Sequence, residues 1–259
     1  MPMTDSSPAP LGRRRVLIAG SAAAAALGVG AAGTAAARPG SPPARTRAGT
    51  ADTAICTLTK KLTEGPYYLD HAFVRSNVAE DKKGVPLQLG LTVVDNSTCA
   101  PLDKALVEIW HADALGEYSG FVGANGHQEP DNRTFLRGGV LTGSDGVAKL
   151  TSIYPGWYVG RCIHVHLKVH TDVTLTDDGS FTGGTEIHTG QLFFAENITE
   201  AVARLSPYAT NTVRRTPLSR DGIYNNGGTA AGLLTVTALG STPSAGYRGT
   251  LTVGVHTDA

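Results

Sequence analysis

Apolar and polar residues alternate with a period of two along much of the chain beyond residue 55. The clearest run is Pro86–Asp95, in which every second residue is an aliphatic one: Leu87, Leu89, Leu91 and Val93. Successive side chains of a β-strand point to opposite faces, so this alternation predicts a strand with one buried face. Shorter runs of the same kind cover residues 105–111, 163–170, 190–194, 232–239 and 249–255.

Turn signals separate these runs. Residues 144–146 (SDG) lie between the strand-like residues 138–142 and 147–153, a pattern that predicts a β-hairpin. Helical periodicity is convincing only in residues 197–205, for which Asn197 or Thr199 is the expected N-cap. Many short strands with few helices predict an all-β fold, an antiparallel β-sandwich with long loops and one or two short helices.

The first 54 residues have a different composition. Arg13, Arg14 and Arg15 precede a run of Ala and Gly that ends in small residues at Ala37. This pattern predicts an export signal over residues 1–37, and the consecutive arginines favour the twin-arginine route. The run is long enough for a membrane anchor, but Ala and Gly enter a bilayer poorly and the small-residue exit fits cleavage.

Residues 38–54 are rich in Pro, Arg, Ala, Gly and Thr, which predicts a disordered lead-in to a single domain over residues 55–259. We therefore expect a secreted protein without a stable membrane anchor. The 22 basic and 22 acidic residues balance, so charge indicates no nucleic-acid or other polyanionic partner.

The candidate chemistry begins with His164 and His166. Residues two apart on a strand point to the same side, so their imidazoles can share one metal ion. The other face of residues 163–170 is apolar throughout, so the histidine face is expected to look toward a cleft or solvent. Alone, this pair is weak evidence for a metal, because such pairs also occur on solvated strand faces.

The surrounding residues narrow the choice of metal. Residues 146–171 contain no Asp or Glu, whereas zinc sites and 2-His-1-carboxylate iron(II) sites use a nearby carboxylate or thiolate. The same region offers phenols: Tyr158 follows a Pro-Gly turn, and Tyr118 follows a strand and a Gly-bearing loop. Phenolate is a hard anionic ligand that suits iron(III), although ordinary packing of either tyrosine is the alternative.

The ordered motifs resemble those of the intradiol ring-cleavage dioxygenases, the family of protocatechuate and catechol dioxygenases. The similar segments follow the family order from about Cys56 to Phe194: residues 63–68 (TEGPYY), 107–118 (VEIWHADALGEY), 141–153 (LTGSDGVAKLTSI), 155–158 (PGWY), 161–166 (RCIHVH) and Gln191. The export signal and residues 111–116 (HADALG) are most similar to the extracellular bacterial branch.

The resemblance implies a non-heme iron(III) ion with four protein ligands: Tyr118, Tyr158, His164 and His166. It further implies that substrate displaces Tyr158, which then takes the substrate's proton. Arg161 would stabilise negative charge near the ring, and Gln191 would donate a hydrogen bond from behind the ligands. Glu64 and Tyr67 would border the substrate cavity.

The implied reaction inserts both atoms of dioxygen into a catechol-type ring between its two hydroxyls and yields a muconate-type diacid. The partners are then a small catecholic substrate and dioxygen. Catechol, protocatechuate, hydroxyquinol and lignin-derived catechols all fit, and the oligomeric state, a homo-oligomer included, stays open.

Some residues lie outside the proposed ligand set or would support a different function. Four further histidines match no ligand position of the family: His111, His127, His170 and His188. Asp113 and Glu117 would serve in a carboxylate-type metal site. Rival functions are a copper or zinc β-sandwich that uses the histidine pair, and a non-enzymatic secreted module of the transthyretin-like or carbohydrate-binding type.

The three cysteines are Cys56, Cys99 and Cys162. An exported protein can form a disulfide, and Cys56 with Cys99 is the favoured pair because both lie outside the proposed metal segments. Cys162 lies between Tyr158 and His164, and we expect it to be a buried free thiol.

Overall fold

Eight strands form two sheets within residues 56–70, 73–122, 131–228 and 232–257, which are the residues that the computed structural model describes. One sheet has the order β4-β1-β8-β7, and its strands are β1 (Pro86–Asp95), β4 (Val147–Ile153), β7 (Thr235–Ala238) and β8 (Tyr247–Val255). The other has the order β3-β2-β5-β6, and its strands are β2 (Leu106–Trp110), β3 (Arg137–Leu141), β5 (His164–Leu175) and β6 (Phe181–Phe193). The export signal and lead-in predicted for residues 1–54 lie outside the described residues.

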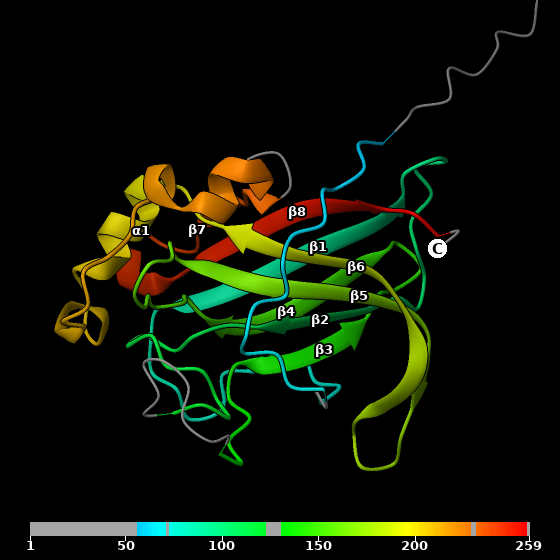
Figure 1. Cartoon of the computed structure of the whole chain (residues 1–259), viewed down its shortest axis with the longest axis horizontal. Coiled ribbons are helices and arrows are strands. Elements are labelled where there is room, and N and C mark those ends of the chain that lie inside the picture. Colours follow the sequence, from blue (N-terminus) through cyan, green and yellow to red (C-terminus); the bar gives the residue numbers. More distant parts are fainter. Residues whose placement is uncertain (1–55, 71–72, 123–130, 229–231, 258–259) are drawn as a thin grey trace, which may run out of the picture. The chain divides into compact units, whose positions relative to one another are not determined.

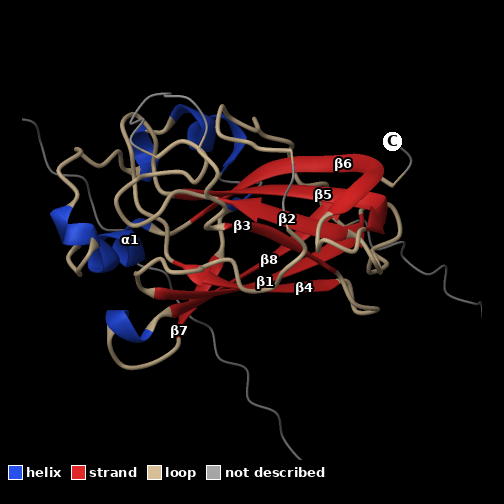
Figure 2. Ribbon diagram, turned by 90° about the horizontal axis from the view of Figure 1, so that it is seen from below, coloured by secondary structure: helices blue, strands red, loops and turns tan. Residues whose placement is uncertain are grey.

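The two sheets lie face to face as the layers of a sandwich (Figure 2). Leu87 and Leu91 of β1 and Val165 and Val169 of β5 are fully buried and belong to one apolar core. Every second residue of β1 and of the first half of β5 therefore faces the opposing sheet, as expected for stacked sheets. The all-β prediction is confirmed, and β1 has the predicted bounds.

The topology differs from the prediction in two respects. β1 and β8 run parallel, with Leu87 opposite Tyr247, whereas the other paired strands run antiparallel. The hairpin predicted from residues 138–153 is wrong, because β3 pairs with β2 in one sheet and β4 pairs with β1 in the other. A turn signal indicates a chain reversal, but it does not tell whether the two strands bond edge to edge or stack across the core.

The predicted helix is present as α1 (Glu196–Ala203), one residue earlier at its start and two residues shorter at its end. Its N-cap is Ala195, without a side-chain hydrogen bond, so the predicted caps Asn197 and Thr199 are wrong and both lie inside the helix. The remaining helical pieces are short: η1 (Tyr208–Thr210), η2 (Leu218–Arg220), η3 (Tyr224–Gly228) and η4 (Pro243–Ala245). Within the described ranges, no helix combines the length and the apolar character needed to cross a bilayer.

A disulfide joins Cys56 to Cys99, with 5.3 Å between the two Cα atoms, which confirms the favoured pairing. It ties the start of the described chain to the turn that follows β1. Cys162 is a free, buried thiol, also as expected. Burial raises the pKa of this thiol, with the nearby Asp221 carboxylate as the next cause.

The segment that follows the disulfide crosses the outer face of the β3-β2-β5-β6 sheet (blue in Figure 1). The backbone N–H of Leu62 donates to Thr189 O at 2.9 Å. Further along, Lys168 Nζ of β5 forms an ion pair with Glu64 at 2.6 Å. This segment covers the first half of β5, where residues 164–170 are all buried, His164 and His166 of the outer face included.

Candidate metal centre

His164 and His166 lie at the beginning of β5 with their ring nitrogens close together. Their Nε2 atoms are 3.1 Å apart, and both side chains are buried. His164 Nδ1 is 2.7 Å from the carbonyl oxygen of Cys162. A carbonyl only accepts hydrogen bonds, so Nδ1 carries the proton and Nε2 presents a lone pair. That lone pair faces His166.

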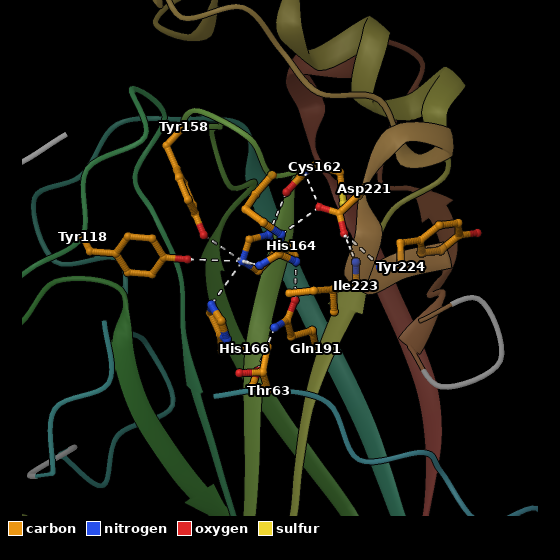
Figure 3. A network of polar contacts seen from close by, with 11 residues as sticks. Thr63, Tyr118, Tyr158, Cys162, His164, His166, Gln191, Asp221, Ile223 and Tyr224 are labelled. Atoms are coloured by element: carbon orange, nitrogen blue, oxygen red, sulfur yellow. Dashed lines mark hydrogen bonds and ion pairs between the residues drawn. The ribbon is translucent and has the colours of Figure 1, made fainter. Parts of the chain in front are cut away.

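Two phenols point at the same nitrogen (Figure 3). The hydroxyl oxygens of Tyr118 and Tyr158 each lie 3.5 Å from His164 Nε2. Four side chains from three separate segments therefore converge on one small volume. We refer to Tyr118, Tyr158, His164 and His166 as the donor cluster.

Aromatic rings hold the donor cluster in place. Tyr67 stacks on Tyr118, with 4.5 Å between ring centroids, and meets Tyr158 edge-on at 5.8 Å. Trp110 of β2 lies parallel to His166 at 4.8 Å, because the two residues are direct partners in the register of β2 and β5. The sequence prediction did not include Trp110. The alternation in residues 105–111 could have placed it on the same face as Glu108, but not opposite His166.

The loops that carry the two tyrosines touch at Gly116. Its φ is +92°, and a Cβ added there would lie 2.2 Å from the carbonyl oxygen of Trp157. Only glycine allows both this backbone conformation and this close approach. Gly116 therefore brings the turn before Tyr118 against the residue before Tyr158.

Replacing Gly116 with alanine is expected to lower the free energy of unfolding by about 2–5 kcal/mol. Backbone strain contributes about 1–2 kcal/mol, and the steric conflict with Trp157 contributes about 1–3 kcal/mol. Gly160 is the matched control, since its φ is +84° but nothing lies within 4 Å of an added Cβ. Gly160→Ala should show the strain alone. Urea unfolding of the two metal-free variants measures the difference, and equal losses would contradict the close approach of the loops.

Burial keeps all four side chains of the donor cluster neutral when no cation is present. Desolvation lowers the pKa of His164 to about 3 and that of His166 well below its usual value, with nearby cationic side chains adding to both effects. Desolvation also raises the pKa of Tyr118 and of Tyr158, although Arg161 opposes the rise for Tyr158. Neutral imidazoles are ready ligands, whereas the phenols need a strongly charged cation to ionise.

The donor set fits iron(III) on these grounds. Two imidazole nitrogens and two phenol oxygens face one point, and two phenolates would offset most of the ion's charge in a buried site. Among the described residues, no group of three or more His, Cys, Asp or Glu side chains is arranged to hold a metal ion. The donor cluster differs from such groups because half of its donors are phenols.

Arg161 and Gln191 lie beside the donor cluster, and the side-chain hydrogen bonds of Gln191 go to Arg161 and Thr63 rather than to the four donors. Arg161 Nη2 donates to Gln191 Oε1 at 2.6 Å, and its Nη1 is 3.5 Å from His164 Nε2. Gln191 Nε2 donates in turn to the carbonyl oxygen of Thr63 at 2.8 Å. This chain of contacts links β5, β6 and the segment that covers them.

Asp221 completes this arrangement and was missed by the sequence prediction. Its carboxylate is fully buried and accepts a hydrogen bond from Arg161 Nε at 2.8 Å. It lies 60 residues after Arg161, beyond the segments from Cys56 to Phe194 that resemble the family. No local pattern in the sequence could have indicated this contact.

The other candidate histidines that the structure describes do not belong to the donor cluster. His111 Nε2 is 2.7 Å from the Ser152 hydroxyl, and His170 Nε2 is 3.2 Å from Glu108. His188 is buried in β6, and its Nε2 has no hydrogen-bond partner among the described residues. His127 lies outside the described residues.

Three acidic residues and Tyr67 were also candidates for the site, and the structure places them as follows. Asp113 forms an ion pair with Lys82 at 2.9 Å, and its Oδ1 accepts the backbone N–H of Glu117 at 3.1 Å. Glu64 is held by Lys168 on the outer face of the sheet. Tyr67 stacks directly on Tyr118 of the donor cluster.

Comparisons with known proteins find related dioxygenases. Residues 63–171 match the family model described as Dioxygenase. An intradiol ring-cleavage dioxygenase from Tetranychus urticae has a similar structure, with 30% identity and a TM-score of 0.67, over 78% of this chain and 95% of that one. The dioxygenase domain of a carbohydrate-binding fusion protein from Streptomyces sp. SirexAA-E is 25% identical with a TM-score of 0.53, over 77% of this chain and 99% of that one.

A sequence relative is catechol 1,2-dioxygenase 1 of Acinetobacter lwoffii. It is 35% identical over an alignment of 137 residues, and the match covers 44% of this chain and 42% of that protein. The chain thus spans less than half the length of this curated relative.

Proposed function

The chain belongs to the intradiol ring-cleavage dioxygenases, and we propose that it is a secreted iron(III) enzyme that opens catechol-type rings between their two hydroxyls. One observation carries this proposal: the phenols of Tyr118 and Tyr158 and the imidazole of His166 all face the lone pair of His164 Nε2. Both atoms of dioxygen would enter the product, a muconate-type diacid.

Tyr118, Tyr158, His164 and His166 would hold the ion. Bound iron(III) supplies the Lewis acidity and the redox chemistry that allow a chelated catechol to react with dioxygen. The protein supplies a buried site whose histidines are neutral and whose phenols lose their protons to the ion's field.

The surroundings of the two tyrosines support different roles for them. Tyr118 is 3% exposed, and Arg137 Nη2 donates to the carbonyl oxygen of the next residue, Ser119, at 2.8 Å. Tyr158 is half-buried and is followed by Val159, which is 70% exposed. Tyr158 can therefore swing away at low cost, leave room for substrate and take up a substrate proton, whereas Tyr118 stays in place.

Arg161 presents its guanidinium beside the donor cluster, where negative charge develops on the reacting ring. A fixed cation in a site shielded from water stabilises such charge strongly. The guanidinium donates a hydrogen bond from Nη2 to Gln191, and Gln191 donates in turn to the carbonyl oxygen of Thr63. Tyr67, stacked on Tyr118, would form one wall of the space for the ring.

The substrate is a small catechol, with dioxygen as the second reactant. Export, as predicted for residues 1–37, would place the enzyme outside the cell, where plant-derived and lignin-derived catechols are the substrates that fit the location. The Cys56–Cys99 disulfide supports a location outside the reducing cytosol.

The test uses the full chain loaded with iron(III). We expect a red-brown colour from tyrosinate-to-iron charge transfer, oxygen uptake with at least one member of a catechol panel, and a ring-opened diacid that carries both atoms of isotopically labelled dioxygen. An aldehyde-bearing product would show cleavage beside the hydroxyls and contradict the proposal. A colourless protein that is active with copper or zinc would favour the rival metalloprotein.

A further inference from the structure

The Arg161 side chain is held on two sides within the site. Its Nε donates to Asp221 Oδ2 at 2.8 Å, and its Nη2 donates to Gln191 Oε1 at 2.6 Å. These two bonds fix the plane of the guanidinium and leave Nη1 facing His164, 3.5 Å from Nε2. The orientation of Arg161 therefore depends on both of its acceptors.

Arg161 also has room to leave this position. On its outer side it borders a surface pocket of about 500 Å³ that Lys60, Lys61 and Ile223 also line. A long, flexible side chain with only one acceptor would sample this space. The hydrogen bond from Arg161 Nε to Asp221 keeps the side chain out of this pocket.

Both oxygens of Asp221 are used, and they face different parts of the chain (Figure 3). Oδ1 accepts the backbone N–H groups of Ile223 and Tyr224, each at 2.9 Å, and so closes a local turn. Oδ2 accepts Arg161 Nε and the backbone N–H of Cys162, both at 2.8 Å. A local turn needs only the first oxygen.

The burial of Asp221 indicates that its carboxylate does more than close the local turn and that it also holds Arg161. An isolated buried carboxylate is strongly unfavourable, and a turn can be capped by an uncharged side chain. Burial alone would raise the pKa of Asp221, but hydrogen bonds from Arg161, Tyr224 and Cys162 lower the pKa to about 2. The charge is therefore matched to the guanidinium of Arg161.

Building on the proposed function, we propose that Asp221 is a positioning residue, which orients the Arg161 guanidinium beside the donor cluster. Through the N–H of Cys162, the same carboxylate fixes the chain two residues before His164. Asp221, which follows α1 in the chain, thus completes the site from outside residues 63–171.

The kinetic test uses Asp221→Asn, Arg161→Ala and the double variant. Asparagine keeps one oxygen for the turn but turns an N–H group toward Arg161 Nε. We expect kcat/KM for a catechol to fall by about 10–100-fold in Asp221→Asn, with the iron charge-transfer band unchanged in position. Arg161→Ala should fall at least as far, and the double variant no further than Arg161→Ala, because the two residues act as a unit. Full addition of the two losses would overturn the proposal.

A second measurement needs no iron. In the metal-free wild type, the Arg161 Nε–H proton should give a distinct, slowly exchanging NMR signal, which Asp221→Asn should abolish. Asp95→Asn is the matched control, because Asp95 also caps a turn, at Ser97 and Thr98, but lies in an exposed turn that makes no contact with Arg161. It should change neither the signal nor kcat/KM.

If Asp221→Asn does not fold, Asp221→Ser replaces it, since a serine hydroxyl can cap the turn but is too short to hold Arg161. An unchanged Arg161 signal, or wild-type kcat/KM in either variant, would overturn the positioning role. A wild type without colour or oxygen uptake would instead contradict the proposed function, and the NMR comparison would still decide whether Asp221 holds Arg161.

Discussion

Replacing His164 with alanine is expected to remove iron binding, the red-brown colour and ring cleavage together. His164 Nε2 is the atom on which the cluster converges, with His166 Nε2 at 3.1 Å and the two phenol oxygens at 3.5 Å. Without it, the ion loses the nitrogen that both phenol oxygens approach, and the two phenols would have to ionise beside a weakly held ion. We expect kcat/KM to fall by at least about 10³-fold.

Metal content, absorbance and oxygen uptake measure this result. His170→Gln is the control, since His170 lies on the same face of β5 but contacts Glu108 rather than the donor cluster. It should keep its iron and its colour. A His164→Ala protein that retains both iron and turnover would contradict the assignment of the site.

Replacing Tyr158 with phenylalanine has the second-largest expected effect, a loss of about 10²–10⁴-fold in turnover, which is the range for a lost general base. The ring keeps its edge-on contacts with Tyr67 at 5.8 Å and with Tyr118 at 5.7 Å, so only the oxygen is removed. One of two phenolates is lost, and the charge-transfer band should weaken rather than vanish. Iron should stay bound, because three of the four donors remain.

Tyr154→Phe is the matched control for this change. Tyr154 is fully buried, and its hydroxyl bonds to the Thr199 hydroxyl at 2.8 Å. Its loss should cost about 1 kcal/mol of stability and leave colour and turnover unchanged. Absorbance and steady-state oxygen uptake of both variants measure whether the Tyr158 hydroxyl contributes to the colour and to turnover. Full turnover in Tyr158→Phe would exclude Tyr158 as the base and favour a non-catalytic role for its hydroxyl.

Much of the fold could be predicted because periodicity is a local property. The alternation in β1 and β5 places aliphatic side chains on one face of each strand, and burying both faces together makes a sandwich. The same local rule put His164 and His166 on one side of β5. The prediction of a β3–β4 hairpin was wrong because these strands belong to different sheets. Pairing depends on which strand lies next to each edge, and the alternation within a strand does not encode its neighbour.

The residue types of the site were thus evident from the order of its motifs, and the family resemblance indicated which tyrosines to consider. Folding alone brought the hydroxyl of Tyr118 to a histidine 46 residues away and the carboxylate of Asp221 to an arginine 60 residues away. Such contacts arise from sheet order, register and close loop packing, as where Gly116 meets Trp157. These depend on interactions between distant segments, and short-range patterns carry no information about them.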